Sequence, residues 1–181
     1  GEHMKQFQKI FFSLTIFFIC SCSGSLPPRN EVIVHELADP ESMNPVNFTD
    51  ATSSYITSHI FQKLIDADFK NPERFVPVLA ESLPLVERTS DSTMSLTFPI
   101  RNEAQWDNGT PITAKDVEFT LKTIKCPLVN NPNAKSYFEF ISDFKFYDDD
   151  PKKFTVISNQ IYFLAEASFG DIPILPEYIY D

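Results

Sequence analysis

Apolar residues alternate with polar ones in several stretches of the chain, and this alternation predicts β-strands. The strands predicted in this way comprise residues 31–36, 94–101, 144–147 and 154–157. The last two are expected to pair through the acidic turn Asp148–Pro151. Pro99 cannot donate a ladder hydrogen bond, so residues 94–101 are expected to form an edge or irregular strand.

A helical spacing of apolar residues predicts a first helix between residue 53 and about residue 66. Either Ser53 or Ser54 can cap its beginning. The apolar positions share one face and are expected to pack inward. They are Ile56, Ile60, Phe61, Leu64 and Ile65.

A second helix is predicted from local capping chemistry as well as from periodicity. Thr113 and Asp116 form a Thr-x-x-Asp pair directly before an apolar helical pattern. The preceding Asn108-Gly109 pair predicts a turn. A short helix is expected at residues 162–167, and the Pro-rich stretch 76–82 is unsuited to a central strand.

Residues 1–30 have the organisation of an export signal followed by a tether. Residues 1–3 resemble an expression-vector remnant, and residues 4–21 combine a basic start with an uncharged apolar run that is too short to span a bilayer comfortably. Residues 22–30 are rich in Ser, Gly and Pro and are expected to be a flexible tether. The remaining residues 31–181 are numerous enough to bury a substantial core.

The end of the signal, Ile19-Cys20-Ser21-Cys22, resembles a bacterial lipobox. Cys22 is therefore expected to be the first mature residue and to carry a lipid, each buried methylene of which contributes about 0.8 kcal/mol to membrane binding. An ordinary cleaved signal with a fortuitous cysteine is the alternative. If Cys20 leaves with the signal and Cys22 is acylated, Cys126 is the one remaining thiol, and it is expected to be half-buried and structural rather than nucleophilic.

The composition indicates a globular domain, and the motifs that would mark several enzyme and metal-binding classes are missing from the sequence. The chain is 43% hydrophobic and 14% aromatic, and its formal net charge of −10 argues against a nucleic-acid partner. It has no phosphate loop, nucleophile elbow or zinc-binding spacing. His35 and His59 lack a ligand at a metal-binding interval, and Asp148–Asp150 lacks the spacing of a calcium loop. No catalytic residue, metal or cofactor is expected.

Four sequence blocks occur in the order found in one known family. They are Glu41–Pro45, Ile60–Ile65, Pro77–Ser82 and Trp106–Val117, the last preceded by Phe98-Pro99-Ile100-Arg101. Together they resemble the oligopeptide-, dipeptide- and nickel-binding proteins of ABC importers, the family 5 extracellular solute-binding proteins. The resemblance covers about residues 32–180. Pro99, the lack of a glycine after Asp68 and the short length depart from the family pattern.

This resemblance implies an α/β fold of the type II periplasmic-binding kind. Residues 31–181 would then represent a truncated first lobe with a small inserted α+β domain. Together with the lipobox, it implies a lipid-anchored protein of the periplasm or cell envelope that captures peptides or similar small solutes. Such a protein delivers its ligand to the permease and ATPase subunits of an importer and performs no chemistry.

The resemblance further places ligand-binding residues in two segments. The loop residues Asn47, Phe48, Thr49, Asp50 and Ala51 are expected to face the ligand cleft, and Tyr137 to reach over it. Trp106 is expected to pack rather than to stack on ligand. The ligand stays open among peptides, nickel chelates, glutathione, haem and sugars. A surface sensor or adhesion lipoprotein, or an envelope hydrolase, remains an alternative function.

Overall fold

The computed structural model describes residues 4, 30–31 and 33–180, and the described residues from 36 onward form one compact unit. The expected lipid attachment at Cys22, the signal beyond Met4 and the tether up to Arg29 lie outside the described residues. Among the helices of the described part, none has the length and apolar character needed to cross a membrane.

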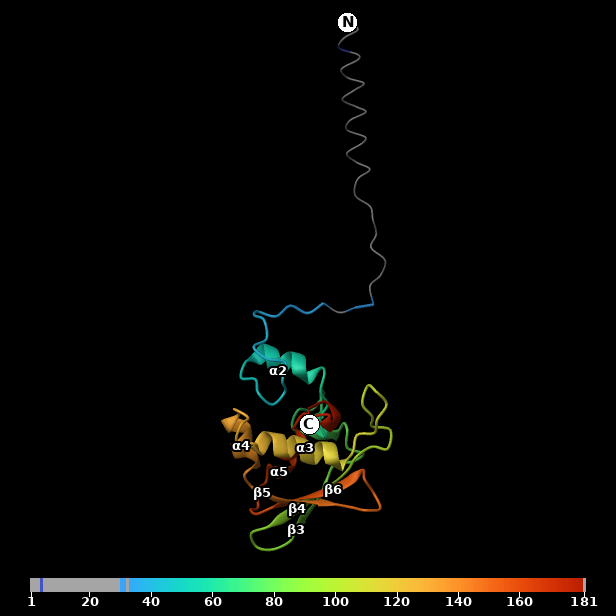
Figure 1. Cartoon of the computed structure of the whole chain (residues 1–181), viewed down its shortest axis with the longest axis vertical. Coiled ribbons are helices and arrows are strands. Elements are labelled where there is room, and N and C mark those ends of the chain that lie inside the picture. Colours follow the sequence, from blue (N-terminus) through green and yellow to red (C-terminus); the bar gives the residue numbers. More distant parts are fainter. Residues whose placement is uncertain (1–3, 5–29, 32, 181) are drawn as a thin grey trace. The chain divides into compact units, whose positions relative to one another are not determined.

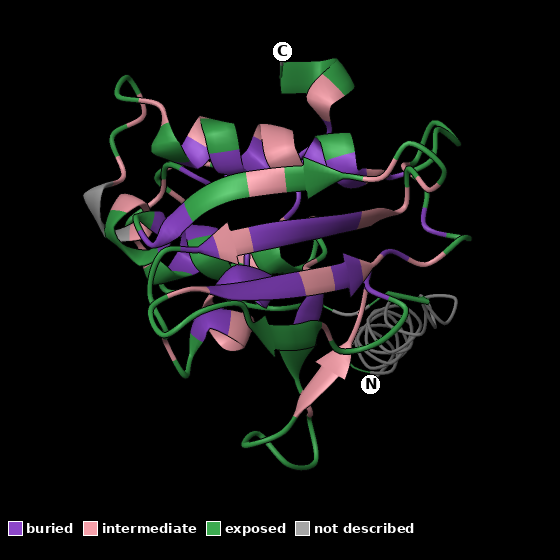
Figure 2. Cartoon of the chain, turned by 90° about the horizontal axis from the view of Figure 1, so that it is seen from below, coloured by how far each residue is buried: buried purple, intermediate pink, exposed green. Residues whose placement is uncertain are grey.

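The unit is built on a four-stranded antiparallel sheet with the order β3-β4-β6-β5. Its strands are β3 (Leu85–Arg88), β4 (Met94–Pro99), β5 (Ile141–Phe146) and β6 (Lys153–Ser158). The pairing of β5 with β6 confirms the hairpin predicted across the acidic turn. Figure 2 shows the two central strands buried along most of their length, whereas β3 is exposed.

The expectation that Pro99 makes its strand an edge or irregular one is wrong, because β4 lies between β3 and β6. Pro99 is the last residue of β4, and the pairing with β3 has already ended at Thr97. Its carbonyl accepts from Glu81 N at 2.8 Å, while the next residue, Ile100, donates to Lys152 O. The proline nitrogen therefore sits where neither neighbouring strand needs a donor.

Aromatic residues from the central strands and one helix form the core. Phe98 and Phe154 are fully buried on adjacent strands, and their ring centroids lie 5.5 Å apart. Phe169, also fully buried, packs on the same rings at 5.5 and 6.1 Å. On the other face, the Thr97 and Thr155 hydroxyls bond each other at 2.8 Å. The alternation read from the sequence thus separates an aromatic face from a hydroxyl face.

Helices cover one face of this sheet, as Figure 1 shows for α3, α4 and α5. The helices are α2 (Ala51–Ser58), α3 (Ala114–Lys125), α4 (Pro132–Phe138), α5 (Ala165–Gly170) and α6 (Glu177–Tyr180). The predicted capping box is confirmed, since Thr113 caps α3 and the Asp116 carboxylate accepts from Thr113 N at 2.8 Å. The short helix predicted at 162–167 lies three residues later, as α5.

The helix predicted from residue 53 to about residue 66 is wrong in extent and in its buried face. It begins after Asp50 and ends at Ser58, and its buried residues are the polar Thr52, Ser53 and Thr57. The apolar residues beyond it belong to a strand instead: Leu64 and Ile65 are fully buried at and beside β1. A short apolar run is compatible with the period of a helix or of a strand, and here pairing with distant backbone makes it a strand.

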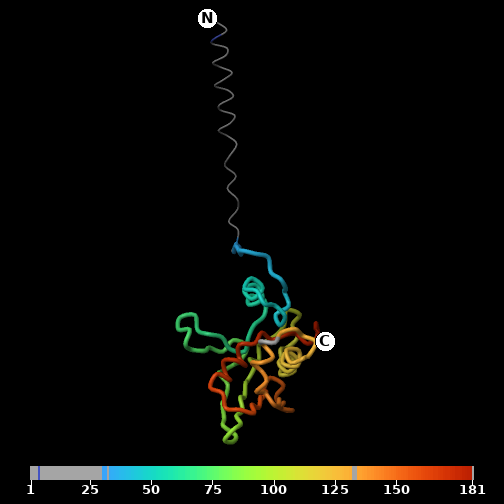
Figure 3. The backbone as a smooth tube through the Cα atoms, turned by 90° about the vertical axis from the view of Figure 1, so that its left-hand side faces the viewer, coloured from blue at the N-terminus to red at the C-terminus, as the bar shows by residue number. Residues whose placement is uncertain are grey.

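Strand β1 (Ile65–Ala67) pairs with β2 (Phe75–Pro77) in a separate two-stranded sheet. This hairpin is the green loop that projects from the rest of the unit in Figure 3. Residues 33–36, in contrast, form no strand, and Ile33 and Val34 are exposed, so the strand expected there is wrong for the described residues. Alternation alone does not make a strand, because a strand needs a partner for its backbone hydrogen bonds.

A late segment of the chain returns to the base of this hairpin. Ile174 N donates to Gln62 O at 3.0 Å, and Lys63 forms a bridge with Pro173. Leu175 N donates to the buried hydroxyl of Thr120 on α3 at 2.9 Å. These contacts join residues more than fifty positions apart and place α5 beside β1.

Candidate functional site

The loop before α2 is a tight turn whose tip is exposed. Asn44 Oδ1 accepts from Val46 N at 3.0 Å, and Asn44 O accepts from Asn47 N at 3.2 Å. Pro45 and Val46 are buried, which anchors the turn, while Asn47 is exposed. The side chain of Asn131 holds the turn from the start of α4, donating to Val46 O at 2.7 Å.

The remaining predicted residues of this loop have mixed roles. Asp50 caps α2, because its Oδ1 accepts from Ser53 N at 2.8 Å. The hydroxyl of Ser53, and then its amide, hold the pKa of the Asp50 carboxyl below its ordinary value. Thr49 and Ala51 are exposed and Phe48 is half-buried, so these three are accessible to a ligand.

Tyr137, the other predicted site residue, lies on α4 and lines a cavity of about 560 Å³. Its side chain is more than half exposed, whereas the neighbouring Phe138 is buried. The cavity lies between the β1–β2 hairpin, α4 and α5, and its volume is in the usual range for ligand pockets. The described lining residues are Asp66, Ala67, Pro72, Phe75, Ala134, Tyr137, Phe138, Leu164, Ala167, Ser168, Asp171 and Ile172.

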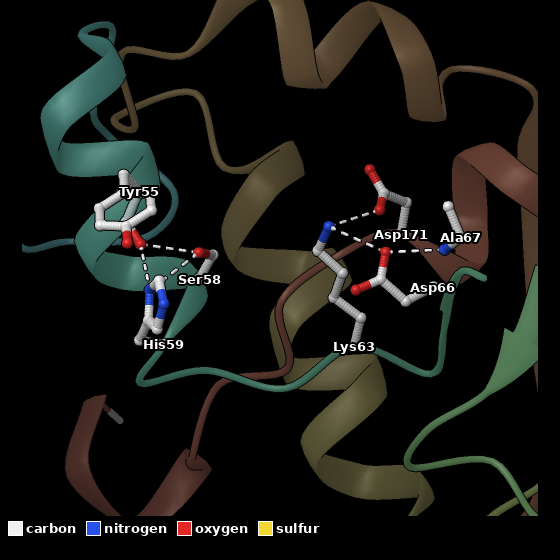
Figure 4. Close-up of polar contacts among 7 residues, drawn as sticks. All are labelled: Tyr55, Ser58, His59, Lys63, Asp66, Ala67 and Asp171. Atoms are coloured by element: carbon white, nitrogen blue, oxygen red, sulfur yellow. Dashed lines mark hydrogen bonds and ion pairs between the residues drawn. The ribbon is translucent and has the colours of Figure 1, made fainter. Parts of the chain in front are cut away.

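Two carboxylates with one shared cation mark the rim of this cavity. Lys63 Nζ lies 2.6 Å from Asp171 Oδ1 and 4.0 Å from Asp66 Oδ1. Asp66 Oδ1 also accepts from Ala67 N at 2.8 Å. Figure 4 shows both carboxylates directed toward the lysine ammonium, separate from the cluster of Tyr55, Ser58 and His59 at the C-terminal end of α2.

A close approach of α5 to β1 sets the position of Asp171. A Cβ added to Gly170 would lie 2.2 Å from Cγ1 of Ile65, a fully buried side chain, so only glycine fits here without a shift. This contact brings the end of α5 against β1 and places Asp171 near Asp66. The glycine therefore shapes the cavity without lining it.

The structure does not gather the predicted site residues around one cavity. Tyr137 lines the 560 Å³ cavity, and none of residues 47–51 is among the described residues that line it. Sequence reasoning missed Asp66 and Asp171. Neither carries a local signal, since the pair arises only when the chain around residue 63 meets the chain around residue 173.

Trp106 has the packing role expected for it. Its ring is half-buried, and Nε1 donates to Oδ1 of the buried Asp116 at 3.3 Å. Its ring meets the ring of Tyr178 edge-on at 6.4 Å. Asp107 accepts from the Tyr178 hydroxyl at 3.0 Å, so this corner ties the Asn108-Gly109 turn to α6.

Comparison with known proteins assigns the family. The profile described as "Bacterial extracellular solute-binding proteins, family 5 Middle" matches residues 74–178, more than half of the chain. The chain belongs to this family. The resemblance inferred from the sequence blocks is thereby confirmed. A curated relative is the periplasmic oligopeptide-binding protein OppA of Haemophilus influenzae, 28% identical over 116 residues, which are 64% of this chain and 20% of the relative.

Solved structures show the same fold. The oligopeptide-binding protein of Thermus thermophilus, determined in complex with a pentapeptide, is 25% identical with a TM-score of 0.58, over 75% of this chain and 23% of that one. NikZ from Campylobacter jejuni, in complex with Ni(L-His), is 21% identical with a TM-score of 0.63, over 79% of this chain and 27% of that one. The expected α/β fold of the type II periplasmic-binding kind, present as a partial domain, is confirmed.

The chain spans about a fifth of the length of the OppA relative that it matches. The matched part contains the four-stranded sheet, α3 and most of the lining of the 560 Å³ cavity.

Proposed function

We propose that this chain is the N-terminal part of the lipid-anchored substrate-binding component of an ABC importer. It captures peptides or similar small solutes in the periplasm or cell envelope and delivers them to permease and ATPase subunits. Residues 31–181 are proposed to form a partial first lobe with a small inserted domain. Cys22 is proposed to carry the lipid, with residues 4–21 as the signal and 22–30 as the tether.

The observation that carries this proposal is membership of the family, together with relatives whose names describe peptide binding. OppA of Haemophilus influenzae is an oligopeptide-binding protein, and the Thermus thermophilus structure holds a pentapeptide. The names of the same relatives support binding rather than catalysis as the proposed role. The cavity beside Tyr137 supports the proposal physically, because apolar and aromatic walls with a few polar groups suit a small organic ligand.

We further propose that the exposed residues of the loop 47–51, together with Tyr137, contact the ligand. Asp50 would act indirectly, by fixing the start of α2. Closure of a second lobe over this surface would be a population shift, because a ligand that touches both lobes favours the closed state.

Native mass spectrometry of the gently purified, full-length mature protein tests the function. Released masses that form a heterogeneous series spaced like amino-acid residues are the expected result. A single mass corresponding to a nickel chelate would instead indicate a ligand like the Ni(L-His) bound by NikZ, and not a peptide. Release of nothing, with no closure on adding peptides, would refute ligand capture and favour a sensor or adhesion role.

The site residues are tested by peptide titration of the same protein with Tyr137→Ala. Loss of an aromatic contact should weaken peptide binding by about tenfold. Phe69→Ala is the matched control, because Phe69 is fully exposed and is absent from the described lining of the cavity. Equal affinities in the two variants would remove Tyr137 from the site.

A further inference from the structure

The 560 Å³ cavity combines an apolar wall with charge of one sign. Most of its described lining is apolar and is formed by Phe75, Tyr137, Phe138 and smaller apolar residues. The charged side chains among the described lining residues are Asp66 and Asp171, and both are acidic. A ligand group that satisfies both features has an apolar stem and a cationic end.

The charges at the rim do not cancel. Lys63 bridges Asp66 and Asp171, so the three side chains together carry a formal charge of −1. The hydrogen bonds and ion pairs found in the described structure engage Oδ1 of each carboxylate and leave Oδ2 unused. Each aspartate therefore retains an oxygen able to accept from a second donor.

A bound metal ion is a poorer occupant than an organic cation. The described residues contain no group of three or more His, Cys, Asp or Glu side chains that could hold a metal. Lysine and arginine side chains, in contrast, commonly lay their methylenes along apolar surface while the charged head meets carboxylates or the face of an aromatic ring. Tyr137 and Phe75 offer such surface beside the two aspartates.

We propose that this cavity is a subsite for a lysine or arginine side chain of a captured peptide. The methylenes lie against Phe75 and Tyr137, and the charged head donates to Asp66 and Asp171. This inference rests on the proposed function and adds a preference for cationic side chains at one position of the peptide. Because both carboxylates are more than half exposed, solvent limits the gain to about three- to tenfold in affinity.

Calorimetric titration of the full-length mature protein with three peptide series tests the subsite. Each series places lysine, its neutral analogue norleucine, or glutamate at successive positions of an otherwise alanine peptide. At one position, lysine should bind about three- to tenfold more tightly than norleucine, and glutamate more weakly. The lysine preference should shrink between about 0.01 M and 0.5 M NaCl, where the screening length falls from about 30 Å to a few ångströms.

Asp66→Asn with Asp171→Asn changes the formal charge of the three rim side chains from −1 to +1, so the lysine preference should be lost or reversed while norleucine peptides still bind. Asp91→Asn with Asp149→Asn is the matched control, since it removes the same charge from exposed turns away from the cavity. The single variants Asp66→Asn and Asp171→Asn, each expected to lose part of the preference, keep the test valid if the double variant unfolds.

The outcomes separate the two proposals. Peptides that bind without any lysine preference, or a preference retained in the Asp66 and Asp171 variants, would overturn the subsite and leave peptide capture intact. Binding of none of the peptides would overturn peptide capture, and the subsite with it.

Discussion

Replacing Asp116 with alanine removes a buried carboxylate that joins three segments of the chain. Its oxygens accept from Thr113 N at 2.8 Å and from Thr113 Oγ1, Trp106 Nε1 and Glu177 N at 3.3 Å each. The residue is only 7% exposed, so water has little access to replace these bonds. The variant should therefore loosen the start of α3, the Trp106 turn and the start of α6 together.

The size of the effect follows from the number of donors left without an acceptor. A hydrogen bond to a charged group contributes about 1.5–3 kcal/mol, and the four contributions are not additive. The bonds to Trp106 and Glu177 are longer than the usual distance of about 2.9–3.0 Å, so they belong at the lower end. We expect Asp116→Ala to lower the free energy of unfolding by about 3–5 kcal/mol. Thr113→Ala, which removes the Lys115 cap bond and the bond from the Thr113 hydroxyl to Asp116, should cost about 1 kcal/mol.

Urea denaturation followed by tryptophan fluorescence measures both variants. Trp106 is the only tryptophan in the chain, so its emission reports on the corner that Asp116 holds together. Asp116→Asn keeps one acceptor oxygen, so its free energy of unfolding should lie between those of Asp116→Ala and Thr113→Ala. If Asp116→Ala costs no more than Thr113→Ala, the carboxylate acts only as a local helix cap and the reasoning about three segments is refuted.

Three further substitutions test the packing around the cavity and the core. Gly170→Ala should lower stability by about 1–3 kcal/mol in urea, because its Cβ would collide with the buried Ile65; an unchanged midpoint would contradict this. Burial raises the pKa of the Glu166 carboxyl above its ordinary value of 4.5, so the charged carboxylate destabilises the fold increasingly as the pH rises through the folded pKa. In melting experiments at different pH values, Glu166→Gln should be more stable than the parent at neutral pH. The two proteins should be equally stable well below pH 4.5. Phe98→Ala should cost about 3–5 kcal/mol in urea, against about 0.5 for the exposed control Leu85→Ala, and similar losses would place Phe98 outside the core.

The elements predicted most accurately are those specified by their own local chemistry. The capping pair Thr113 and Asp116 satisfies backbone donors within four residues, so no distant contact is needed to begin α3. The Asn108-Gly109 turn is equally local, with Gly109 at φ 82°. The β5–β6 hairpin needs only an acidic turn between two alternating stretches.

The elements predicted wrongly depend on contacts with distant parts of the chain. Leu64 and Ile65 fit a helical period, but the backbone around them pairs with residues 75–80 and 173–174. Asp50 caps α2, and it lies three and four residues before Ser53 and Ser54, the serines expected to cap the helix. The prediction that β4 is an edge or irregular strand fails because the effect of Pro99 depends on which strand faces its nitrogen. That neighbour is set by the order of strands in the sheet and not by the local sequence.

The candidate site also depends on contacts between distant parts of the chain, so the sequence predicts it poorly. Tyr137 was predicted only through the family resemblance, since α4 has no strong apolar period of its own. Asp66 and Asp171 are separated by more than a hundred residues, and the Lys63–Pro173 bridge and the glycine at 170 bring them together. A chain of this family could therefore keep its capped α3 and its sheet while exchanging these few side chains. Ligand preference could then change without loss of the fold, because Asp66, Tyr137 and Asp171 are not among the buried residues that form the core.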